Sequence, residues 1–135
     1  MTFQHNDGGM VAAGYKKPKK DCVIRAIAIA TQTPYLEVRD LINQIAGNDV
    51  DARNKGVDKK VTKALMAHLG WTWTPTMMVG SGCKVHLVAD ELPLGCLVVS
   101  VSKHLTVMID GVIHDVYDDV ARGGKRAVYG YWKKD

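Results

Sequence analysis

The pattern of apolar and polar positions divides this chain into a helical first half and a strand-rich second half. Apolar residues recur at helical spacing over three segments, which predicts helices at 22–31, 34–46 and 58–69. Short runs rich in β-branched and aromatic residues predict strands at 71–74, 96–102, 104–109, 112–117 and 127–132. Helices followed by an antiparallel sheet indicate the α+β class, with the helices packed on the sheet.

The chain of 135 residues has the size of a single domain. We expect an irregular basic arm over 1–20, a helical part over 21–70 and a sheet part over 71–135. The content of 47% hydrophobic and 24% charged residues is typical of a globular protein. No apolar run reaches the roughly 20 residues of a membrane span, and a signal-peptide core is missing, so a cytoplasmic location is expected.

Cys22 is the candidate nucleophile, because it begins the most apolar of the predicted helices. Unpaired N–H groups and the positive end of the helix dipole favour a thiolate at this position. Asp21 is predicted to be the N-cap, with its side chain accepting an N–H from the first turn. The lysine cluster at 16–20 is either a solvated loop or a positive rim beside the cysteine that attracts anionic substrates.

A tight hairpin supplies the candidate base and its partner. The pair Asp110-Gly111 predicts a two-residue turn. This register places His104 and Asp115 on one face of the sheet, within reach of a side-chain hydrogen bond. His114 then points to the opposite face, and a slip of one residue would exchange His114 and Asp115.

A thiolate, a histidine and an acid together carry out nucleophilic acyl transfer. The backbone N–H of Cys22 is one candidate oxyanion donor. No glutamine lies a few residues before Cys22, which leaves Gln4, Asn6 and Tyr15 as upstream candidates for a second donor. We expect no cofactor.

Two features of the cysteines argue against other chemistry. Three cysteines, an odd number, favour free thiols over a disulfide scaffold. Cys83 and His86 form only half of a metal site, because no second pair stands at zinc-finger spacing, so no metal is expected. Cys96 begins a buried strand and is expected to belong to the core.

These motifs resemble the papain-like cysteine peptidase superfamily. The resemblance consists of Cys22 heading a helix, followed by the segments 97–104 and 109–115. It is closest in style to the small bacterial and phage members of the C39-type and NlpC/P60-type peptidases. It implies Cys22 as nucleophile, His104 as base and Asp115 as orienting residue, whereas in NlpC/P60-like members the third residue is often a histidine, for which His114 is the alternative.

The expected function is therefore a cysteine hydrolase that cleaves a peptide, isopeptide or other amide bond through a thioester. Transglutaminase-like acyl transfer uses the same Cys-His-Asp chemistry and remains open. A non-catalytic papain-fold protein that binds a host partner, of phage or bacterial origin, is the alternative from another class. The expected partner is a peptide or protein substrate; nucleic acid has weaker support, and oligomeric state is left open.

Overall fold

The computed structural model describes residues 2–46, 56–76, 85–87, 91–101, 104–117 and 127–134. The helices among them are α1 (Cys22–Thr31), α2 (Tyr35–Ala46) and α3 (Lys59–His68). The strands are β1 (Thr2–His5), β2 (Trp71–Pro75), β3 (Cys96–Val101), β4 (His104–Ile109), β5 (Val112–Asp115) and β6 (Val128–Lys134). The predicted α+β class is confirmed. No helix in the described part of the chain is long and apolar enough to cross a membrane.

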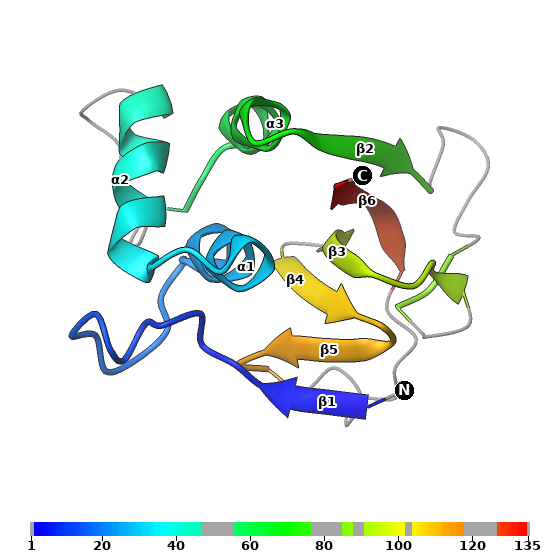
Figure 1. Ribbon diagram of the computed structural model, residues 1–135, viewed down its shortest axis with the longest axis horizontal. Coiled ribbons are helices and arrows are strands. Elements are labelled where there is room, and N and C mark those ends of the chain that lie inside the picture. Colours follow the sequence, from blue (N-terminus) through cyan, green and yellow to red (C-terminus); the bar gives the residue numbers. More distant parts are fainter. Residues whose placement is uncertain are drawn as a thin grey trace.

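The strands form one six-stranded sheet in the order β1-β5-β4-β3-β6-β2. Neighbouring strands are antiparallel, except that β1 runs parallel to β5. Helix α1 lies between α2 and the sheet and contacts β4, β3 and β5 (Figure 1). This packing brings Cys22, at the start of α1, close to His104, at the start of β4.

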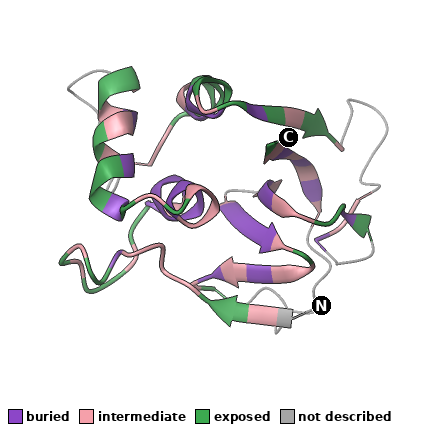
Figure 2. Ribbon diagram, viewed as in Figure 1, coloured by how far each residue is buried: buried purple, intermediate pink, exposed green. Residues whose placement is uncertain are grey.

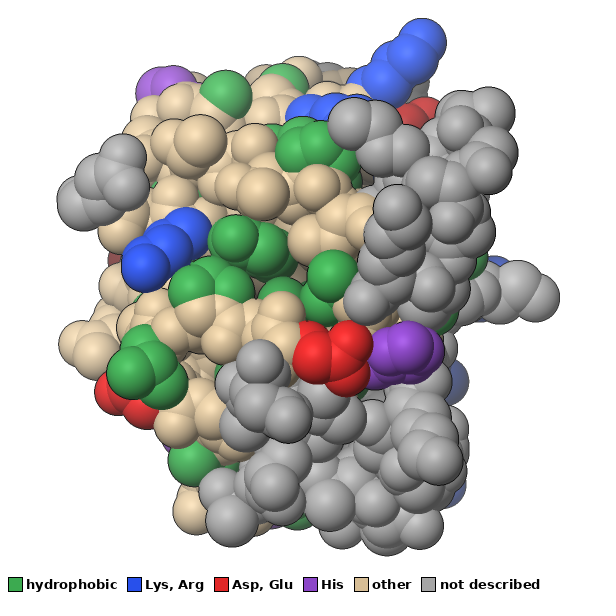
Figure 3. All heavy atoms as spheres, turned by 90° about the vertical axis from the view of Figure 1, so that its right-hand side faces the viewer, with side chains coloured by type: hydrophobic (Ala, Val, Ile, Leu, Met, Phe, Trp, Pro, Cys, Tyr) green, Lys and Arg blue, Asp and Glu red, His purple; other side chains and the backbone are tan. Residues whose placement is uncertain are grey.

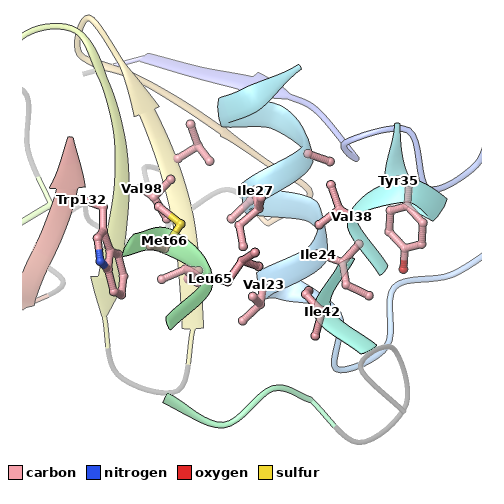
Figure 4. Close-up of a cluster of buried hydrophobic side chains, with 14 of the residues drawn as sticks. Val23, Ile24, Ile27, Tyr35, Val38, Ile42, Leu65, Met66, Val98 and Trp132 are labelled. Atoms are coloured by element: carbon pink, nitrogen blue, oxygen red, sulfur yellow. The ribbon is translucent and has the colours of Figure 1, made fainter. Parts of the chain in front are cut away.

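Helix α1 is central because its sequence is apolar almost all around. Residues 23–28 are buried, while α2 and α3 each bury only one face (Figure 2). Its apolar side chains meet those of α2, α3, β3 and β6 in one cluster (Figure 4), which includes Ile24, Ile27, Val38, Ile42, Leu65, Met66, Val98 and Trp132. A helix covered on all sides is held in a fixed position.

The β4–β5 hairpin has the predicted register. Asp110 and Gly111 both have positive φ, 48° and 83°, as the favoured two-residue hairpin turn requires. The Asp110 carboxylate also accepts the N–H of Gly95 at 2.7 Å, which ties the turn to the start of β3. Ile109 pairs with Val112 and Val107 with His114.

Two expectations about the sheet are wrong. Residues 2–5, expected in an irregular arm, form β1 and make the sheet mixed, because a four-residue edge strand has too short a pattern to recognise. Strand β5 ends at Asp115 instead of residue 117, since its carboxylate accepts the N–H of Val116 at 2.7 Å and turns the chain. Residues 47–55, 77–84 and 118–126, with Cys83 among them, lie outside the described residues.

Gly130 offers a test of how β6 packs on β2. A Cβ at this position would lie 2.4 Å from the Trp73 ring and 2.8 Å from the carbonyl oxygen of Thr74. We expect Gly130→Ala to lower the free energy of unfolding by about 1–3 kcal/mol, measured by urea denaturation. Thr72→Ala, at an exposed position of β2, is the control. Equal denaturation midpoints for Gly130→Ala and the unmodified protein would contradict this packing.

Candidate active site

Cys22 and His104 meet where α1 begins against the start of β4. The Cys22 side chain is partly buried, and the nearby His104 imidazole and Leu105 backbone N–H both lower the pKa of its thiol. Packing of α1 on β4 is the long-range contact that joins the two residues. The structure therefore places the predicted nucleophile beside the predicted base.

Asp115 is hydrogen-bonded to His104 and to Thr106. Nε2 of His104 lies 2.6 Å from Oδ2 of Asp115, which also accepts the Thr106 hydroxyl at 2.7 Å. Because Nε2 faces the carboxylate, Nδ1 is the ring nitrogen left to face the sulfur. His114, the alternative third residue, lies on the other face with its Nδ1 3.4 Å from the amide nitrogen of Asn6.

The buried Arg25 guanidinium forms ion pairs with two carboxylates next to the site. Its Nε donates to Asp21 at 3.1 Å and its Nη1 to Asp115 at 3.2 Å, and all three side chains are at most 3% exposed. Arg25 thus pairs with both acids at once. Sequence reasoning missed this bridge, because nothing local to Arg25 indicates a partner 90 residues away.

The expected N-cap bond of Asp21 is wrong. Asp21 occupies the N-cap position, but its side chain makes no cap hydrogen bond. Its carboxylate instead accepts the Tyr35 hydroxyl at 2.7 Å, the Arg25 Nε and the backbone N–H of Lys19. The first N–H groups of α1 thus lack the side-chain cap that Asp58 supplies to α3 through the N–H of Lys60.

The electrostatics favour a thiolate–imidazolium pair. Burial raises the pKa of the Cys22 thiol, but the hydrogen bond and charge of His104 reverse this effect and lower the pKa below its usual value. Burial lowers the pKa of His104, yet the bonds to Asp115 and Cys22 raise it to about 9. Burial raises the pKa of Asp115, while His104 and Thr106 lower it overall. At neutral pH the proton therefore resides on His104.

A cleft of about 600 Å³ opens beside this pair, and both Cys22 and His104 line it. The Tyr117 ring stands edge-on to the His104 ring with 5.9 Å between centroids, and it lies 5.6 Å from the Arg25 guanidinium carbon. Trp73 and Trp132 also line the cleft, with ring centroids 4.4 Å apart. Cys22 thus borders a cleft that is lined in part by aromatic side chains.

The three upstream candidates for a second oxyanion donor bond elsewhere. Gln4 donates to the carbonyl of His5, Asn6 contacts His114, and the Tyr15 hydroxyl accepts from Arg39. None of the three is among the described residues that line the cleft.

Cys96 and His86 lie among the described residues and can be compared with the expectations for them. Cys96 is partly buried against the main cluster, and burial raises the pKa of its thiol, which sets it apart from Cys22. His86 contacts Glu91 at 3.2 Å. No group of three or more metal-binding side chains occurs among the described residues. Cys83 lies outside them.

Comparison with known proteins gives no match: no family model, no curated protein and no solved structure is significantly similar to this chain. The chemistry proposed for the site therefore rests on its geometry and charges alone.

The pair of Cys22 and His104 predicts an unusual titration. Ultraviolet absorbance of the thiolate at Cys22 should appear below the pH of about 8.5 at which a free cysteine ionises. His104→Ala should move this step upward, because the imidazolium that lowers the Cys22 pKa is lost. Cys22→Ser, measured in parallel, subtracts the other thiols. A Cys22 step at or above the ordinary cysteine pKa would contradict the ion pair.

The Arg25 bridge predicts a large loss of stability on substitution. Arg25→Met leaves the buried Asp21 carboxylate without its cation and Asp115 with His104 alone, so we expect unfolding to become easier by about 3–5 kcal/mol in chemical denaturation. Arg39→Met, which removes a partly exposed pair with Asp40, should cost under about 1 kcal/mol. A loss at Arg25 no larger than that at Arg39 would contradict the bridging role.

Proposed function

We propose that this protein is a cysteine hydrolase that cleaves a peptide, isopeptide or other amide bond through a thioester on Cys22. The single observation that carries the proposal is that Cys22 and His104 line the same cleft, while His104 Nε2 lies 2.6 Å from the buried Asp115 carboxylate. A nucleophile, a base and a group that orients the base, in contact and open to a ligand, are what acyl transfer requires.

The proposed reaction has two halves. The Cys22 thiolate attacks the carbonyl carbon, and the imidazolium of His104 gives its proton to the departing amine, which leaves a thioester on the sulfur. Neutral His104 then takes a proton from water, and the resulting hydroxide attacks the thioester. The acid product departs, and the thiolate and imidazolium are restored. Asp115 keeps the ring oriented and stabilises its charge in both halves.

The start of α1 supplies the proposed oxyanion site. In the tetrahedral intermediate the former carbonyl oxygen is negative and close to the sulfur. The backbone N–H of Cys22, at the first helical position, has no partner within the helix, and the Asp21 side chain does not cap the turn. This N–H and the positive helix end stabilise the oxyanion.

Kinship with the papain-like superfamily belongs to the same proposal. What supports it is the order of parts: a cysteine at the start of a buried helix, followed by an antiparallel hairpin that carries a histidine and an aspartate. The parallel β1 at the sheet edge is an addition to that order.

Acyl enzyme formation is the test of the proposed nucleophile. With p-nitrophenyl acetate, we expect a burst of p-nitrophenolate and an acetyl group on Cys22, identified by peptide mass spectrometry. Cys22→Ala should abolish both, and Asp115→Asn should slow the burst by about 10²–10⁴-fold because the imidazole loses its orienting carboxylate.

Cys96 is the internal control for this experiment, since its raised pKa makes it a poor nucleophile. Equal, slow acetylation of Cys22 and Cys96 would indicate the non-catalytic binding protein. An added amine distinguishes hydrolysis from acyl transfer: capture of the acetyl group by the amine in preference to water would favour the transglutaminase-like reaction.

A further inference from the structure

We propose that the cleft beside Cys22 selects acidic peptide segments as its ligands. This inference rests on the proposed function and names its substrate class. It starts from four lysines that line the cleft: Lys19, Lys20, Lys59 and Lys63. They come from two separate segments, the approach to α1 and the first two turns of α3, so the fold and not a single charge run gathers them.

Among the described residues, the charged side chains that line the cleft are all positive. All four lysines are exposed, and none is within ion-pair distance of a carboxylate among the described residues. No described Asp or Glu lines the cleft. The charge of Arg25, in contrast, is already matched by Asp21 and Asp115. On the face shown in Figure 3, Lys and Arg side chains stand at separate places and form no continuous patch.

Contacts hold three of the four lysines at the cleft, through the backbone of Lys19 and the ammonium groups of Lys59 and Lys63. The backbone N–H of Lys19 donates to the buried Asp21 carboxylate at 3.1 Å, which anchors the Lys19–Lys20 pair next to the nucleophile. The Lys59 ammonium lies 5.6 Å from the centre of the Tyr129 ring, and that of Lys63 lies 5.8 Å from Trp73. These cation–π contacts hold both side chains over the aromatic wall.

An acidic peptide fits these surroundings better than other anions. The aromatic wall accepts apolar side chains and peptide groups, while the lysines attract carboxylates along the same segment. The nucleophile requires a carbonyl carbon, which a peptide offers and a nucleic-acid phosphodiester does not. A segment rich in Asp and Glu therefore satisfies both the charge of the cleft and the chemistry of Cys22.

Two alkylating reagents that differ in charge test the field at the sulfur. Iodoacetate is an anion and iodoacetamide is neutral. Each alkylates the Cys22 thiolate with loss of iodide, adding a carboxymethyl or a carbamidomethyl group to the sulfur. We expect the iodoacetate-to-iodoacetamide rate ratio at Cys22, followed by peptide mapping, to fall about tenfold when the four lysines become glutamine. It should also fall as salt is added, because charges are screened over about 10 Å at about 0.1 M salt.

The matched control is the double variant Lys133→Gln/Lys134→Gln, which removes two lysines at the end of β6 that do not line the cleft. Its rate ratio should equal that of the unmodified protein. A ratio equally unchanged in the four-lysine variant would overturn the proposal.

Binding to the full-length Cys22→Ala variant tests the ligand class directly. Fluorescence anisotropy should show binding of an oligoglutamate peptide and none of oligolysine, and the four-lysine variant should lose the oligoglutamate. Tighter binding of a single-stranded oligonucleotide of equal charge would overturn the choice of a peptide.

The two proposals fail in different ways. If Cys22 reacts with iodoacetamide as slowly as Cys96, the hydrolase is refuted, while oligoglutamate binding still decides the character of the cleft. If Cys22 reacts rapidly with both reagents and the ratio ignores the lysines, the nucleophile stands and the acidic ligand is refuted.

Discussion

The buried guanidinium of Arg25 is the interaction on which the rest of the site depends. It joins Asp21, at the start of the central helix, to Asp115, at the end of β5, and so fixes the helix that carries Cys22 relative to the hairpin that carries His104. Removal of its charge would leave Asp21 in the core without a cation and Asp115 with His104 alone, and a buried carboxylate that loses its cation is strongly unfavourable. The same cation holds Asp115 in the position from which it contacts His104.

Much of the architecture could be predicted from the sequence because its signals are local. Asp110-Gly111 determines a turn whose register follows from residues a few positions away, and this register places His104 and Asp115 on one face. The apolar pattern of 22–31 gives both bounds of α1. The proximity of Cys22 and His104 depends on the packing of α1 on β4. The sequence predicted this proximity only from the chemistry of the two residues.

What the sequence could not show depends on distant partners. The four residues of β1 acquire their strand geometry from β5, which lies more than a hundred positions away, and their own pattern is too short. The two partners of Arg25 and the gathering of Lys19 and Lys20 with α3 are likewise set by tertiary structure. Of the lysine cluster at 16–20, interpreted from sequence as either a solvated loop or a rim beside the cysteine, Lys19 and Lys20 line the cleft while remaining exposed.

Asp21 occupies the N-cap position of α1 without capping the helix with its side chain. A side-chain cap on α1 would contribute about 1 kcal/mol, whereas loss of a partner from a buried ion pair costs about 3–5 kcal/mol. The larger effect prevails, so the carboxylate faces Arg25 and Tyr35 and leaves the helix start uncapped. The first N–H groups of α1 then remain without a side-chain acceptor at the helix end that carries Cys22, where the proposed reaction develops a negative oxygen. One choice of partner by Asp21 thus links the stability of the core to the proposed chemistry of the cleft.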